Sequence, residues 1–184
     1  NALSEHKTPL SDYDALYEEY LPRVEEAERN NDEVEYAAVI TEVTYKFYDS
    51  HTYAYFTPDM KLDTCEYMAG NDYGLSMIRV DDGSIIAVSI EPDCEANKQG
   101  IHDGTTITAW DNQDIEEAVA ETECCFPGFS FPVEENEDVF RPMFLAGKGG
   151  ESVDITFIND EGVEQTISVK SIDNYYNRLA DTYE

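Results

Sequence analysis

Apolar positions in the first part of the chain recur at the spacing of a helix. An amphipathic helix is predicted by apolar residues three and four positions apart, namely Leu16, Tyr17, Tyr20, Val24 and Ala27. Pro22 falls inside this pattern, so we expect a short helix and then a second one that carries Pro22 in its first turn. Asp32 followed by Glu35 resembles a capping box and predicts a further helix. Its apolar face would consist of Val34, Ala38, Ile40 or Thr41, Val43 and Phe47.

From Tyr73 onward the apolar pattern becomes that of strands. A β-hairpin is predicted where the apolar runs 75–80 and 85–90 flank the turn sequence Asp81-Asp82-Gly83. A short helix over residues 94–99 is expected to end at Gly100, because glycine suits the left-handed conformation that closes a helix.

The remaining elements alternate between strands and turns. A strand over 104–110 is followed by a turn at 111–113, and Asp114 is placed to cap a helix that contains Ile115, Ala118 and Val119. Clean alternation predicts two more strands over 152–158 and 163–169, joined by a turn. The fold class is therefore predicted to be α+β, with a small N-terminal helical hairpin before the strands.

The charge balance excludes several classes of partner. The 184 residues contain 41 acids and 11 bases, which gives a formal net charge of −30 at pH 7. A nucleic-acid binder needs clustered Lys and Arg, and an electrostatic dock on anionic lipid needs the same, so neither partner is expected. Hydrophobic residues still make up 41% of the chain, which indicates a folded protein rather than a disordered one.

The start of the chain carries no segment of the kind that inserts into membranes. No apolar run approaches the roughly 18–20 residues that span a bilayer, and the first residues do not resemble a signal peptide. The chain begins Asn1-Ala2 without a methionine, which indicates processing or trimming, and we interpret these two residues as a cloning remnant. Direct membrane insertion is therefore not expected of this sequence, and its start does not indicate where the natural protein resides.

The cysteines and acidic clusters do not form a recognisable metal motif. Cys65, Cys94, Cys124 and Cys125 make no CxxC pair, so buried or free thiols are favoured over a disulfide framework, which the sequence leaves open. Acids cluster at 81–82, 111–114 and 134–138, but none follows EF-hand spacing, so solvated acids are favoured over calcium ligands. We expect neither a metal nor a cofactor.

The order of strands and helices after residue 71 is that of a PDZ domain, and five segments carry the resemblance. Residues 73–77 resemble the carboxylate-binding loop, 91–101 the "PGSPAEKAGL" segment, 102–112 the "KPGDRILSVNG" segment, 114–119 the groove helix and 145–153 the "LRGPKGTKVTL" segment. Upstream, Asp49-Ser50-His51-Thr52 is similar to the "DSHT" motif of the C-terminal processing (tail-specific, tricorn-like) serine peptidases. In that family the motif closes a helical segment just before the PDZ domain.

The resemblance implies a domain organisation and a partly open fold. It implies a helical domain over 1–70, a PDZ-like domain over 71–172 that is a partly open β-barrel or sandwich with two helices, and a tail or linker over 173–184. An insertion at about 123–140 departs from the family, whose members cross this gap in a few residues. Nothing in the chain resembles the catalytic domain with its nucleophilic serine and lysine base.

The resemblance also implies a peptide-binding site and no catalytic residue in this chain. A PDZ groove adds a peptide C-terminus to one strand, while backbone N–H groups of the preceding loop hold its carboxylate. The implied peptide-binding residues are Gly74, Leu75, Ser76, Met77, Ile115 and Val119. The alternative is an ordinary strand whose Leu and Met belong to the core. His51 with Asp49 invites a catalytic interpretation, but a structural role in the turn is favoured.

The function expected from this resemblance is recognition rather than hydrolysis. The chain would be the substrate-recognition or regulatory fragment of an exported serine-type endopeptidase, inactive alone. Its partners would be C-terminal tails of protein substrates and a catalytic domain of the same polypeptide. The family places such a protein outside the bacterial cell or in its envelope. Two alternatives stay open: a non-enzymatic exported PDZ adaptor, and a scaffold with a degenerate groove.

Overall fold

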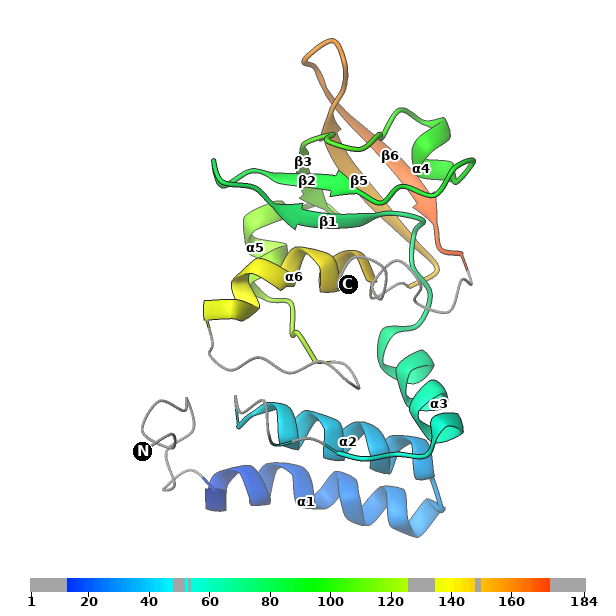
Figure 1. Cartoon of the computed structure of the whole chain (residues 1–184), viewed down its shortest axis with the longest axis vertical. Helices are drawn as coiled ribbons and strands as arrows, with labels where there is room; N and C mark the ends of the chain where they lie inside the picture. The colour runs from blue at the N-terminus through cyan, green and yellow to red at the C-terminus, as the bar shows by residue number, and fades with distance from the viewer. Residues whose placement is uncertain (1–12, 48–51, 53, 126–134, 148–149, 173–184) are drawn as a thin grey trace. The chain divides into compact units, whose positions relative to one another are not determined.

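The protein consists of two compact units. The computed structural model describes residues 13–47, 52, 54–125, 135–147 and 150–172 (Figure 1). Unit 1 comprises residues 1–68 and 125–137, and unit 2 comprises residues 69–124 and 138–184. The "DSHT" residues Asp49, Ser50 and His51 lie outside the described residues.

Unit 1 is helical, but its first helix is not interrupted as the sequence predicted. Helix α1 (Tyr13–Asn30) is continuous, with Pro22 inside it, and packs against α2 (Glu33–Tyr45). A proline inside a helix removes one backbone hydrogen bond and destabilises the helix by about 3 kcal/mol. Burial of Tyr20 and Ala27 on either side of Pro22 offsets this loss, because both side chains pack in the interior. The expectation of two short helices was therefore wrong.

An ion-pair network connects α1 to α2. Arg23 of α1 donates from Nε to Glu35 Oε1 at 3.0 Å and from Nη2 to Glu42 Oε1 at 3.1 Å, both carboxylates on α2. These hydrogen bonds hold the pKa of the Arg23 guanidinium above its ordinary value. The Tyr67 hydroxyl donates to the other Glu35 oxygen at 2.7 Å, so α3 (Pro58–Ala69) joins the same network.

Asp32 begins α2, although only half of the predicted capping box forms. The Asp32 side chain accepts a hydrogen bond from the Glu35 backbone N–H at 3.0 Å, which confirms the cap. The Glu35 carboxylate does not return to the cap because it binds Arg23 and Tyr67. The buried face of α2 consists of Ala37, Ala38, Val39 and Thr41. It therefore shares Ala38 and Thr41 with the predicted face but excludes Val43.

Unit 2 contains two small antiparallel sheets. The first consists of β1 (Ser76–Arg79) and β2 (Ile85–Val88), and the second has the order β4-β3-β5-β6. The strands of the second sheet are β3 (Ile107–Trp110), β4 (Gln113–Asp114), β5 (Ser152–Ile158) and β6 (Glu164–Lys170). Single bridges pair Ile86 with Thr106 and Asp72 with Ile172. The α+β class is confirmed, and the described strands do not form a closed barrel.

The turns predicted from sequence lie where they were expected. Gly83 closes the β1–β2 hairpin with φ +91°, and its N–H donates to the Val80 carbonyl at 2.9 Å. Helix α4 (Glu95–Lys98) begins after Cys94, whose sulfur accepts from the Asn97 N–H, and is followed by Gly100 at φ +102°. Asp114 caps α5 (Ile115–Ala120) by accepting from the Glu116 N–H at 2.9 Å.

Two helices were not predicted from the sequence. Helix α3 forms where no helical pattern had been identified, and helix α6 (Glu135–Gly147) overlaps the expected insertion at about 123–140. Pro142 lies inside α6, and this proline made the segment resemble an irregular one. Met143, Phe144 and Ala146 are all buried, so packing stabilises a helix whose local sequence does not favour it.

The four cysteines are buried free thiols, so no disulfide connects them in this structure. Within the described ranges, no helix is long and apolar enough to cross a membrane.

Candidate functional site

The outer edge of β1 is the structural feature that could accept an added strand. Among the described strands, β1 pairs only with β2. The Val80 N–H donates to the Ser84 carbonyl, and Ile78 lies opposite Ile86. The backbone groups that form hydrogen bonds with β2 therefore belong to every second residue along β1. The backbone N–H and C=O groups of Leu75 and Met77 therefore point to the outer edge, whereas those of Ser76 point to β2.

Gly74 holds the loop before β1 in a conformation that only glycine adopts easily. Its φ is +76°, and a Cβ placed there would lie 2.7 Å from the Cys94 Cβ. The Gly74 N–H donates to the buried Asp72 carboxylate at 2.7 Å, and its carbonyl accepts from the Glu91 N–H at 2.7 Å. The resemblance implied the N–H groups of Gly74, Leu75 and Ser76 as carboxylate donors. That of Gly74 is thus engaged by Asp72.

The implied pocket residues lie in the core of unit 2. Leu75, Met77, Ile115 and Val119 are buried and belong to one hydrophobic cluster. Ser76 is also buried, and its hydroxyl has no hydrogen-bond partner within the described part of the chain. β1, its preceding residue Leu75 and α5 thus contribute side chains to one cluster, and these side chains are buried.

A bidentate ion pair connects β1 to α5. Arg79 of β1 donates to the two carboxylate oxygens of Glu116 on α5, at 2.7 and 2.8 Å. This pair holds the pKa of the Glu116 carboxyl below its ordinary value. Arg79 also donates to the Gly83 carbonyl at 2.9 Å, so one side chain links the hairpin turn to the helix. The sequence offered no signal for this pair, because 37 positions separate its members.

Helix α6 packs on the same core, beside α5 and β1 (Figure 1). Ala146 belongs to the cluster that contains Leu75 and Val119, and Leu145 packs against it. Arg141 Nη1 donates to the carbonyl of Ala120, the last residue of α5, at 3.2 Å and to that of Thr122, just after it, at 2.5 Å. These contacts hold α6 on the core at the end of α5, and we call this helix the α6 cover.

Tyr73 connects two further parts of unit 2 through a hydrogen bond and a ring contact. The Tyr73 hydroxyl accepts a hydrogen bond from the Gly150 N–H at 2.9 Å, and its ring meets Trp110 edge-on. Burial raises the pKa of the Tyr73 phenol. In the described ranges, no group of three His, Cys, Asp or Glu side chains is arranged to hold a metal ion.

The comparisons with known proteins give weak likenesses only. No protein-family model and no curated protein matches the chain. Mature CPAF, a chlamydial serine protease, complexed with lactacystin is 12% identical over 61% of this chain and 24% of its own, with a TM-score of 0.40. Mature CPAF alone gives 12% identity over 76% and 25%, with a TM-score of 0.40, and a CPAF mutant gives 13% over 67% and 28%, with a TM-score of 0.37.

This chain spans about a quarter of the length of those proteins. A likeness at this TM-score does not by itself assign a family or an activity.

Proposed function

We propose that this chain is the non-catalytic recognition part of a C-terminal processing serine peptidase. In this proposal unit 2 is a PDZ-like module that takes C-terminal tails of protein substrates, and a Ser-Lys domain of the same polypeptide hydrolyses the peptide bond. Export to the cell envelope or the medium accompanies the family resemblance. The proposal rests on the order of the sequence motifs and on one structural observation: among the described strands only β2 pairs with β1, whose Arg79 is joined to α5.

The edge of β1 supports binding by strand addition. An added peptide strand would pair with the outward N–H and C=O groups of Leu75 and Met77. Its terminal carboxylate would accept from the Leu75 N–H, since Asp72 occupies the Gly74 N–H. The last apolar side chain of the peptide would contact the Met77 and Val119 side chains, which are buried in the core that Ala146 of α6 also joins.

The packing of α6 on the core limits peptide binding. Because α6 packs on this core, a peptide reaches it only in molecules where α6 has moved aside, and its apparent affinity falls by the fraction of such molecules. The net charge of −30 adds a repulsion against a carboxylate. We therefore expect weak binding by the isolated chain.

Amide hydrogen exchange tests the proposal directly. Peptides that end in an apolar residue with a free carboxylate should slow exchange at Leu75 and Met77, while Ser76 and Ile78, which face β2, change little. The same peptides with an amidated C-terminus should give weaker protection. Equal protection by the amidated and free peptides would reject the carboxylate-loop assignment, and unchanged exchange at both outward positions would reject strand addition.

The peptidase assignment needs a separate test. Sequencing the complete reading frame beyond residue 184 should reveal a domain that carries a nucleophilic serine and a lysine base. A frame that joins unit 2 to further binding domains instead would favour the adaptor alternative.

A further inference from the structure

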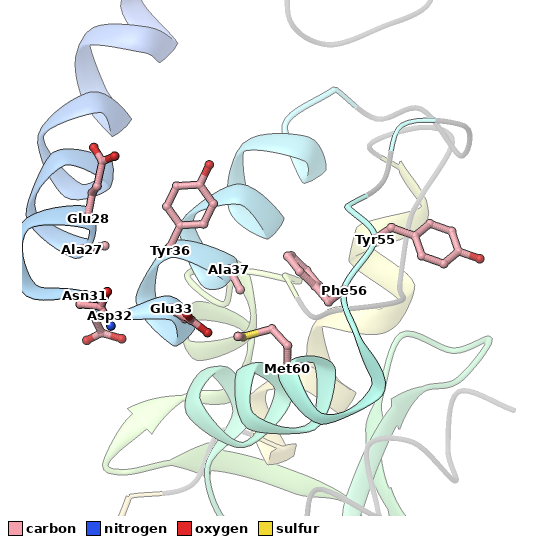
Figure 2. Close-up of a pocket in the computed structure, with 10 residues that line it drawn as sticks. All are labelled: Ala27, Glu28, Asn31, Asp32, Glu33, Tyr36, Ala37, Tyr55, Phe56 and Met60. Atoms are coloured by element: carbon pink, nitrogen blue, oxygen red, sulfur yellow. The ribbon is translucent and has the colours of Figure 1, made fainter.

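Unit 1 contains a pocket that the proposed function does not use. The pocket has a volume of about 450 Å³ and lies between the end of α1, the first turns of α2 and the start of α3 (Figure 2). Its lining residues are Ala27, Glu28, Asn31, Asp32, Glu33, Tyr36, Ala37, Tyr55, Phe56 and Met60. This volume lies within the range of pockets that hold a small ligand or a few peptide side chains.

The walls of the pocket are apolar and partly aromatic. Figure 2 shows Phe56 and Met60 between α2 and α3, and Tyr36, also a lining residue, extending upward from α2 in this view. Tyr36 is 45% exposed and Tyr55 is 88% exposed, although both are large rings. Exposed aromatic side chains beside a cavity favour association with an apolar group.

The polar part of the lining is acidic. Glu28, Asp32 and Glu33 are exposed carboxylates of the lining, and no Lys, Arg or His is among the residues that line it. Glu28 lies in the last turn of α1, where the helix dipole is negative, so the dipole adds to its charge. Of the two bases on this helix pair, Arg23 is engaged by Glu35 and Glu42, and Arg29, in the last turn of α1, does not line the pocket.

We propose that this pocket binds a basic segment of a partner protein. One large apolar side chain of that segment enters the cavity against Phe56 and Met60, and flanking Lys or Arg side chains pair with Glu28 and Glu33 at the rim. Charge complementarity selects this occupant. A second copy of this chain carries the same net charge of −30, and an anionic ligand meets three carboxylates, so both are repelled.

The test uses short peptides that the β1 edge cannot bind through a carboxylate. The probe is acetyl-Lys-Lys-Leu-Phe-Lys-Lys-amide, and its partner replaces Leu-Phe by Gly-Ser, so both carry the same charge. Fluorescence anisotropy with the whole 184-residue chain should show the Leu-Phe peptide binding at least about fivefold more tightly. Equal affinity of the two peptides would overturn the proposal, since it would indicate attraction to acidic surface alone.

Matched variants locate the site. The double change Glu28→Gln and Glu33→Gln should weaken binding of the Leu-Phe peptide about five- to tenfold. Glu25→Gln with Glu66→Gln removes the same charge from exposed positions that do not line the pocket and should weaken binding less than twofold. Equal losses in both double variants would overturn the proposal.

A further pair of variants tests the apolar wall. Tyr36→Ala should weaken binding of the Leu-Phe peptide but not of the Gly-Ser peptide. Tyr17 is an exposed tyrosine outside the pocket, so Tyr17→Ala should change the affinity of neither peptide. The far-UV circular dichroism of each variant, compared with that of the unchanged chain, shows whether unit 1 remains helical. A folded Tyr36→Ala variant with unchanged affinity would contradict the proposed cavity contact. Because unit 1 carries the pocket and both peptides have blocked ends, these results do not depend on the PDZ-like proposal.

Discussion

Gly74 is the residue at which backbone conformation and close packing coincide. Its φ of +76° and the nearness of Cys94 both exclude a side chain. It also positions the loop that leads into the open edge of β1.

Gly74→Ala should destabilise the protein by about 2–4 kcal/mol, from strained φ and from overpacking against Cys94. Urea denaturation followed by circular dichroism measures this change. Gly83→Ala is the matched control, because Gly83 has φ +91° but no atom within 4 Å of its Cβ position. We expect the control to lose only about 1 kcal/mol. Equal losses would show that the contact with Cys94 contributes nothing.

Glu116 is the residue whose protonation should matter for the β1–α5 pair. Its pKa is lowered by Arg79, so its contribution to stability is present above the unfolded pKa and is lost as pH falls through the folded pKa. Both side chains are partly exposed, which limits the contribution to about 0.5–1 kcal/mol. Glu116→Gln should therefore lower stability at neutral pH, and the difference should shrink as pH falls below the ordinary glutamate pKa and vanish only below the lowered folded pKa.

Glu117→Gln serves as the control for this pH dependence. It removes a carboxylate from the same first turn of α5, which lies exposed and away from Arg79. Denaturant midpoints measured across the acidic range compare the two variants. If Glu117→Gln shows the same loss at neutral pH, the Arg79 pair is not its cause.

At the scale of elements, the proposed peptide binding by unit 2 depends on the position of α6. The helix packs its buried face on the core beside α5, and Arg141 fastens it to the Ala120 and Thr122 carbonyls. The edge strand and the groove helix of the proposed site thus exist together with an intramolecular cover. Under the proposed function, an equilibrium between forms with α6 docked and forms with α6 displaced would set the peptide affinity.

Arg141→Ala should raise the affinity for apolar, free-carboxylate peptides about three- to tenfold. Loss of the hydrogen bonds to Ala120 and Thr122 weakens the cover by about 1 kcal/mol and increases the uncovered fraction. Isothermal titration with one peptide measures the change. Arg29→Ala removes an equal charge from α1 and should slightly lower affinity through added repulsion. If Arg141→Ala behaves like Arg29→Ala, α6 does not compete with the peptide.

At the scale of the whole molecule, the net charge of −30 acts oppositely on the two proposed sites. It repels a peptide carboxylate at the edge of β1 and attracts a basic segment to the pocket of unit 1. The short-range backbone donors and the apolar walls provide specificity at each site. The electrostatic field of the whole chain adds a repulsion at one site and an attraction at the other, and dissolved salt screens both.

Raising the salt concentration from 50 to 500 mM should therefore strengthen the binding of free-carboxylate peptides and weaken the binding of the blocked Lys-Lys-Leu-Phe-Lys-Lys peptide. The screening length falls from about 14 Å to about 4 Å over this range. An amidated neutral peptide serves as the control and should respond little. Anisotropy titrations at several salt concentrations measure all three. If salt changed the affinities of the free-carboxylate peptides and of the Lys-rich peptide in the same direction, the proposed effect of the net charge would be wrong.

The sequence by itself determined the features that depend on neighbours in the chain. Gly83, Gly100 and Asp114 each impose a turn or cap by their own conformational or hydrogen-bonding preference, so these boundaries were predicted. The alternation of β5 and β6 likewise specifies strands with one buried face. Such signals need no knowledge of distant contacts.

Tertiary structure decided the features in which packing opposes local preference. Pro22 and Pro142 both lie inside helices, because buried neighbours such as Tyr20 and Phe144 contribute more than the lost backbone bond. The Arg79–Glu116 pair and the packing of Ala146 of α6 into the core join residues far apart in sequence. The motif order could therefore indicate a binding strand, but only the fold determined that its side chains are covered, since burial is a property of the whole core.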